Sequence, residues 1–154
     1  MDCVLRAASG NDAPCVAQLL IDTRSRFMPY APSAHSEDEV REWVAATLVP
    51  GGGVIVAEVR GRVLGAMAIA RDSGGAWITQ MAVDPAVVRQ GLGSMLLAHA
   101  LGTLPRPVRL YTFQANNGAR RFYERHGFAA IQFTDGHGNE EHCPDVLYEL
   151  GATP

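Results

Sequence analysis

Met81-Ala82-Val83-Asp84-Pro85 is followed, three residues later, by Arg89-Gln90-Gly91-Leu92-Gly93-Ser94-Met95-Leu96-Leu97. The first segment ends an apolar run, and Asp84-Pro85 is expected to stop that strand. The apolar residues that begin at Leu92 recur at helical spacing, so a helix is predicted to follow the glycine turn. Glycines at the start of a helix leave backbone N–H groups free to hold a phosphate. Taken alone, the turn is equally typical of a tight structural connection, because it is neither a full dinucleotide fingerprint nor a lysine-bearing Walker loop.

The chain before this segment predicts three consecutive antiparallel strands preceded by one strand and two helices. Apolar, β-branched runs cover residues 54–59, 63–70 and 76–83, with turn residues between them. Runs this apolar suit a sheet that is covered on both faces. Further upstream, residues 3–7 predict a strand, Asn11-Asp12-Ala13-Pro14 predicts the start of one helix, and the capping box Ser36/Glu39 predicts the start of another.

The chain after this segment predicts a strand over 108–113, a helix and two final strands over 129–134 and 146–149. Asn116 is expected to open the helix and Gly127 to end it in the left-handed conformation. We expect one α/β domain over residues 1–154.

Composition limits the classes of protein that the chain fits. It has 154 residues, 47% of them apolar, and 13 basic against 16 acidic side chains give a net charge of −3. The high apolar fraction argues against disorder, and the near-neutral net charge argues against general binding to nucleic acid. All the basic residues are arginine, which excludes a catalytic lysine. No apolar run is long enough to span a membrane and no signal peptide is recognisable, so we expect a cytoplasmic protein without membrane association. The three scattered cysteines are expected to be free thiols.

A second candidate for chemistry is the helix that Asn116 opens. Tyr123 follows Asn116 by seven residues, so the two lie on nearly the same side of that helix, about 10 Å apart along its axis. The alternative interpretation is an N-cap asparagine and a tyrosine at the edge of the core.

Together these segments resemble the GNAT superfamily of N-acetyltransferases. The resemblance rests on residues 81–85, on residues 89–97 and on the pattern Asn116-x-x-Ala119-x-x-Phe122-Tyr123-Glu124-x-x-Gly127-Phe128, in the family's order and spacing. It implies an α/β (α+β) fold with a central, mostly antiparallel sheet of six to seven strands flanked by about four helices. One departure is Val88, which stands where the family usually has Arg or Gln, and Arg89 is the candidate to supply that charge.

The resemblance implies acetyl-CoA as the acyl donor and an amine as the acceptor, with no metal. Main-chain groups of Met81 and Val83 would hold the pantetheine arm, the N–H groups of Arg89 to Ser94 would hold the pyrophosphate, and Tyr123 would protonate the departing thiolate. The full set of residues implied to bind acetyl-CoA is Met81, Ala82, Val83, Arg89, Gln90, Gly91, Leu92, Gly93, Ser94, Asn116, Ala119 and Tyr123.

The residues that would bind the acceptor amine are less clearly marked in the sequence than those implied to bind acetyl-CoA. An alkylammonium must lose a proton before it attacks, so a base or an ordered water is required. The candidate bases are Glu141, which we favour, and Glu140, Asp145, His35 and Glu37. Phe27, Tyr30 and His35 are expected to border the acceptor, and Trp43 and Trp77 are expected in the core or an interface. His137, His142 and Cys143 lack the spacing of a zinc motif.

Several alternatives stay open. A longer acyl group is the alternative within the enzyme class, and a non-catalytic acyl-CoA-binding or regulatory module is the alternative outside it. A nicotinamide oxidoreductase is disfavoured because the glycine turn follows antiparallel strands. Polyamines, aminoglycosides, amino acids, protein N-termini and lysine side chains are all candidate acceptors, and the slight acidic excess favours a cationic one. A homodimer through an edge strand or the C-terminal segment is compatible with the resemblance.

Overall fold

All seven predicted strands and four predicted helices are present in the computed structural model, which describes residues 2–152. The strand boundaries differ from the predicted ones by at most two residues. The strands are β1 Cys3–Ala7, β2 Val54–Val59, β3 Arg62–Asp72, β4 Gly75–Val83, β5 Val108–Phe113, β6 Ala129–Thr134 and β7 Asp145–Leu150. The helices are α1 Ala13–Phe27, α2 Glu37–Trp43, which continues into a π-helical turn Val44–Leu48, α3 Leu92–Leu101 and α4 Asn117–Arg125.

The strands form a seven-stranded sheet in the order β1-β2-β3-β4-β5-β7-β6. Five neighbouring pairs are antiparallel and the β4–β5 pair is parallel. The predicted fold, a mostly antiparallel sheet with four flanking helices, is therefore confirmed.

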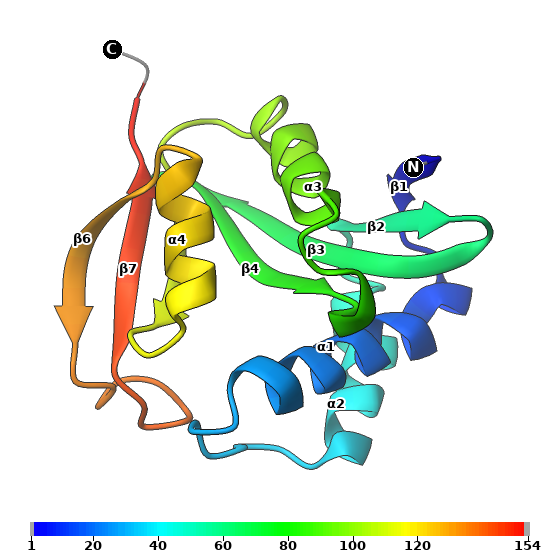
Figure 1. The fold of residues 1–154 in the computed structure, drawn as a ribbon, viewed down its shortest axis with the longest axis horizontal. Helices are drawn as coiled ribbons and strands as arrows, with labels where there is room; N and C mark the ends of the chain where they lie inside the picture. Colours follow the sequence, from blue (N-terminus) through cyan, green and yellow to red (C-terminus); the bar gives the residue numbers. More distant parts are fainter. Residues whose placement is uncertain (1, 153–154) are drawn as a thin grey trace.

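Helices cover both faces of the first half of the sheet, with α1 and α2 on one face and α3 on the other, while α4 lies on the same face as α3 over the second half (Figure 1). Adjacent residues of a strand point to opposite faces, so β2 contributes to two cores at once. Val56 packs with α1, whereas its neighbour Ala57 packs with α3, and both are fully buried. The prediction of strands buried on both faces is confirmed for β2 and β3.

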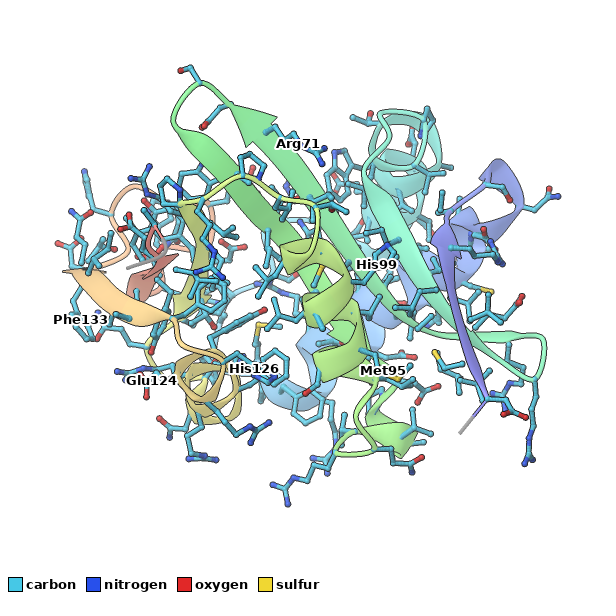
Figure 2. The ribbon with its side chains drawn as sticks, turned by 90° about the horizontal axis from the view of Figure 1, so that it is seen from above. Arg71, Met95, His99, Glu124, His126 and Phe133 are labelled. Carbon is cyan, nitrogen blue, oxygen red and sulfur yellow. The ribbon has the colours of Figure 1, made fainter. Side chains whose placement is uncertain are left out.

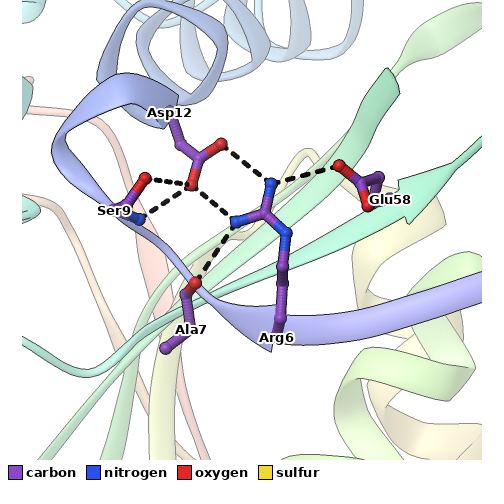
Figure 3. Close-up of polar contacts among 5 residues, drawn as sticks. All are labelled: Arg6, Ala7, Ser9, Asp12 and Glu58. Carbon is purple, nitrogen blue, oxygen red and sulfur yellow. Dashed lines mark hydrogen bonds and ion pairs between the residues drawn. The ribbon is translucent and has the colours of Figure 1, made fainter. Parts of the chain in front are cut away.

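An arginine fixes β1 against the start of α1 (Figure 3). The Arg6 guanidinium donates to both carboxylate oxygens of Asp12, at 2.7 and 3.0 Å, and to Glu58 of β2 at 3.2 Å. The Ser9 N–H also donates to Asp12, at 2.7 Å. The hydrogen bond from Arg6 is the main reason that the pKa of Asp12 falls to about 2.

The sheet divides between β4 and β5. These strands pair at Ala76–Val108 and at Trp77–Arg109 and then diverge. A bulge at Thr79 interrupts the register between β3 and β4 at the same level, and bulges bend the strand that carries them. The divergence leaves one edge of β4 without a strand partner beyond Trp77. No helix among residues 2–152 is both long and apolar enough to span a membrane.

Candidate active site

The free edge of β4 presents main-chain groups of Met81 and Val83. Opposed residues of an antiparallel pair alternate between hydrogen-bonded and non-bonded pairs. The Asp84 N–H donates to the Leu64 carbonyl at 2.8 Å, which fixes this alternation. Ala82 therefore lies in a bonded pair with Ala66, while Met81 and Val83 lie in non-bonded pairs with β3. The N–H and C=O groups of Met81 and Val83 consequently point away from β3, into the gap between β4 and β5.

The glycine turn supplies a second set of free donors, at the N-terminus of α3. Gly91 is the N-cap in a left-handed conformation, with φ of 90°, and Met95 donates the first intrahelical hydrogen bond, to the Gly91 carbonyl at 3.0 Å. The N–H groups of Leu92, Gly93 and Ser94 precede that bond and have no partner within the helix. This arrangement is the one that binds anionic groups at helix N-termini.

Arg89 also adopts a left-handed conformation, with φ of 69°. The conformation costs a residue with a side chain roughly 1–2 kcal/mol. It turns the chain so that the segment from Val88 to Gly91 leads directly into α3.

Helices α3 and α4 lie side by side on the same face of the sheet (Figure 2). A Cβ atom at Gly93 would lie 3.4 Å from the Phe122 ring, in ordinary contact, so the start of α3 packs directly beside α4. The two predicted coenzyme segments, which are separated in sequence, therefore meet at the β4–β5 gap.

Tyr123 packs on the sheet side of α4 with 6% of its surface exposed. Its ring contacts the rings of Phe122 and Phe128, with centroids 5.1 and 5.6 Å away. Burial raises the pKa of the Tyr123 hydroxyl well above its usual value, so the group carries its proton at neutral pH.

Asn116 has a structural role. Its side-chain oxygen accepts a hydrogen bond from the Ala119 N–H at 3.2 Å and so caps α4. The interpretation of Asn116 as an N-cap is confirmed, and the predicted contact with pantetheine is not tested by this geometry.

A cleft of about 1150 Å³ opens on the opposite side of β4 from the glycine turn. Its walls come from α1, the segment between α1 and α2, α2 itself, β4 and the loop between β6 and β7. The residues of β4 that line it are Gln80 and Met81. Met81 therefore belongs both to the predicted coenzyme segment and to the cleft.

Two polar contacts join the opposite walls of the cleft. Arg24 of α1 lies 3.5 Å from Glu141, and Nε2 of His35 lies 3.0 Å from the Glu140 carboxylate. In Figure 1 the segment between α1 and α2 and the loop between β6 and β7 run side by side at the bottom of the molecule. The cleft is therefore closed at this end by residues more than 100 positions apart in sequence.

The structure separates the predicted acceptor residues into two groups. His35, Glu37, Glu140 and Glu141 line the cleft, whereas Phe27 and Tyr30 lie outside its lining. Phe27 is 36% exposed beneath Arg26, and Tyr30 packs edge-to-face on Phe113 with centroids 6.2 Å apart. Asp145 is buried, where it accepts hydrogen bonds from Thr134 and Asn139 and braces the β6–β7 loop.

Sequence reasoning missed Gln80, Trp43 and Arg24 as cleft residues. Gln80 carried a signal, because it is polar within the apolar run of β4. Trp43 was expected in the core or an interface, but it is 40% exposed and lines the cleft. Arg24 had no local signal, since its partner Glu141 is distant in sequence. Within residues 2–152 no group of three or more His, Cys, Asp or Glu side chains is arranged to hold a metal ion.

Comparison with known proteins agrees with this geometry. The sequence model of the Acetyltransferase (GNAT) family matches residues 19–128, which is most of the chain, so the protein belongs to the GNAT acetyltransferase family. Among curated proteins, none matches the sequence.

Solved structures with the same fold include three acetyltransferases. A GNAT-family acetyltransferase from Bacillus cereus ATCC 10987 is 15% identical with a TM-score of 0.77, and the match covers 100% of both chains. The PaiA N-acetyltransferase from Thermoplasma acidophilum, in complex with coenzyme A, is 18% identical with a TM-score of 0.76, covering 99% of this chain and 100% of that one. The ribosomal-protein-S18-alanine N-acetyltransferase from Escherichia coli is 18% identical with a TM-score of 0.76, covering 99% and 96%. The TM-scores show that the three proteins share the fold of this chain.

Proposed function

We propose that this protein transfers the acetyl group of acetyl-CoA to a primary amine by direct attack of the amine on the thioester. The observation that carries the proposal is the position of Met81. Its main-chain groups face the β4–β5 gap, and it also lines the cleft on the other side. A thioester held along this edge of β4 would therefore meet an amine that enters from the cleft.

The chain offers suitable partners for each part of acetyl-CoA, which supplies the activated acetyl group. The free edge of β4 offers main-chain donors and acceptors to the amide groups of the pantetheine arm. The unpaired N–H groups of Leu92, Gly93 and Ser94 and the positive end of α3 suit the pyrophosphate, and Arg89 can add a full positive charge. The coenzyme A complex of the similar PaiA fold supports this choice of cosubstrate.

The reaction requires three things of the protein. An N–H group of the β4 edge stabilises the negative charge that develops on the carbonyl oxygen as the amine nitrogen bonds to the acetyl carbon. Glu141, which lines the cleft, accepts the proton that the amine loses, directly or through one water. Tyr123 donates a proton to the sulfur as the carbon–sulfur bond breaks, and burial keeps that proton on the hydroxyl until then.

The test is the release of coenzyme A thiol from acetyl-CoA with a panel of amines and basic peptides. An enzyme-only blank is needed because Cys3, Cys15 and Cys143 are free thiols. Release that depends on an amine, together with a product that is heavier by one acetyl group, is the expected result. Saturable binding of acetyl-CoA with a silent panel would instead favour a non-catalytic acyl-CoA-binding module.

A further inference from the structure

Acidic side chains outnumber basic ones much more strongly in the cleft lining than in the chain as a whole. Five glutamates line the cleft, Glu37, Glu39, Glu42, Glu140 and Glu141, while the basic side chains in the lining are Arg24 and His35. With His35 neutral, the five glutamates and Arg24 give the lining a net charge of −4, against −3 for the entire protein counted in the same way. The negative potential of the molecule is therefore directed at this cleft.

Several of these carboxylates lack a full countercharge. Arg24 is paired with Glu141, and Glu37 is paired with Arg41 at 3.3 Å. His35 lies between two carboxylates, 3.8 Å from Glu39 and 3.0 Å from Glu140, and so neutralises at most one of them. Glu42 has no ion-pair partner among residues 2–152. A hydrogen bond from the Ser36 N–H lowers the pKa of Glu39, which keeps this carboxylate ionised.

The rest of the lining is largely apolar. Leu20, Met28, Val40, Trp43 and Ala46 form much of the surface between the carboxylates. The volume of about 1150 Å³ exceeds what a small monoamine would fill, since drug-sized ligands occupy sites of roughly 300–1000 Å³. The cleft lining thus combines apolar side chains that suit methylene groups with carboxylates that suit ammonium groups.

We infer that the acceptor is an aliphatic diamine or polyamine, with one amine at the thioester and a second ammonium held by carboxylates of the cleft lining, Glu140 and Glu42 among them. The inference rests on the proposed acetyl transfer and specifies its substrate class. A single exposed ion pair contributes little, but several carboxylates acting on one ammonium together give specificity. Trp43 offers its face to the alkyl chain or to an ammonium group.

The experiment compares two acceptors that differ in one group. The diamine 1,4-diaminobutane and the monoamine n-pentylamine have the same number of heavy atoms, and n-pentylamine has a methyl group in place of the second amine. We expect kcat/KM to be at least about tenfold higher for the diamine at low salt, equivalent to about 1.4 kcal/mol. This preference should shrink as sodium chloride is added, because salt screens exposed charges.

Two variants and a matched control locate the second ammonium. Glu140→Gln and Glu42→Gln should each lower the ratio of the two kcat/KM values several-fold. For Glu42→Gln, the rate with n-pentylamine should stay nearly unchanged. Asp38→Asn is the control, because Asp38 is also an acidic residue of α2 but its side chain is 97% exposed and lies outside the cleft lining. Its ratio should match that of the wild-type protein.

The outcomes separate the two proposals. Equal kcat/KM values for the two amines, or a ratio that neither glutamine variant changes, would overturn the polyamine inference. Thiol release with basic peptides but with neither amine would also overturn it and leave acetyl transfer standing. No thiol release with any amine or peptide would remove the proposed function, and the inference with it.

Discussion

At the scale of single residues, Tyr123 combines a buried ring with a hydroxyl that stays protonated. If the hydroxyl donates the proton to the leaving sulfur, Tyr123→Phe removes that proton but preserves the ring packing against Phe122 and Phe128. We expect kcat to fall on the order of 10²-fold, with little change in the dissociation constant of acetyl-CoA. Steady-state kinetics and calorimetric titration measure the two quantities. Tyr111→Phe is the control, since Tyr111 is 53% exposed on β5.

An unchanged kcat in Tyr123→Phe would show that water or another group protonates the sulfur. A fall in acetyl-CoA affinity equal to the fall in kcat/KM would instead make Tyr123 a packing residue of the coenzyme site. The raised pKa of Tyr123 adds a second expectation. Because the hydroxyl keeps its proton, the wild-type rate should not fall between pH 7 and pH 10 through ionisation of Tyr123.

At the scale of elements, the N–H groups of β4 point alternately towards β3 and towards the gap, and this alternation predicts how individual amides respond to acetyl-CoA. The N–H groups of Met81 and Val83 face the gap, whereas that of Ala82 belongs to a bonded pair with β3. Acetyl-CoA should therefore slow hydrogen exchange at Met81 and Val83 strongly and at Ala82 only weakly. Amide exchange followed by NMR, with and without acetyl-CoA, resolves the three neighbours. Protection that is equal at all three would indicate general rigidification and contradict binding along this edge.

The junction of β1 with α1 predicts a dependence of stability on pH. Asp12 has its pKa lowered to about 2 by Arg6 in the folded protein, against 3.8 for the ordinary group. A lowered pKa stabilises the fold above the ordinary value, and this contribution is lost as the pH falls from about 4 towards 2. Asp12→Asn should lower the free energy of unfolding by about 1–2 kcal/mol at pH 7, a value reduced for the partial exposure of Arg6.

Urea unfolding of both proteins at several pH values measures this difference. The gap between the wild-type protein and Asp12→Asn should narrow as the pH drops below 4. Asp22→Asn is a matched control, because Asp22 is an exposed acid of α1 that bonds to Gln18. A gap that stays constant down to pH 2 would show that the carboxylate charge is not what Arg6 stabilises.

The elements themselves were predictable because their signals are local. Period-two and helical spacing, the Ser36/Glu39 capping box and Gly127 each act within a few residues, and the structure has the expected strand, helix or turn at each place. The antiparallel order β2-β3-β4 was also predictable, because turns join these consecutive strands. The pairing of β5 with β4 and with β7 was not predicted, since it depends on contacts between distant segments.

At the scale of the whole molecule, the two halves of the candidate site differed in how far the sequence could predict them. The proposed coenzyme side would use main-chain groups of contiguous segments, so a motif suffices to propose Met81 and Gly91. The cleft is assembled from α1, α2, β4 and the β6–β7 loop, and neither the Arg24–Glu141 pair nor the exposure of Trp43 has a local signature. Side chains from distant loops become neighbours only when the fold is known.

The divided sheet makes a final prediction about ligand and stability. The part from β1 to β4 meets the part from β5 to β7 at two residue pairs, so a ligand seated in the gap contacts both parts. A ligand that binds the folded state alone at 100 times its dissociation constant adds about 2.7 kcal/mol, which raises Tm by roughly 5–10 °C for a chain of this size.

ADP lacks the pantetheine arm and can engage the N-terminus of α3 but not the gap. At equal ligand concentrations, the difference in Tm between acetyl-CoA and ADP reports the binding free energy that the pantetheine arm adds, because each shift depends on the ratio of ligand concentration to dissociation constant. We expect a larger rise in Tm with acetyl-CoA than with ADP at the same concentration, together with slower hydrogen exchange in both β4 and α4. Equal shifts with no added protection of β4 would mean that the coenzyme binds outside the gap.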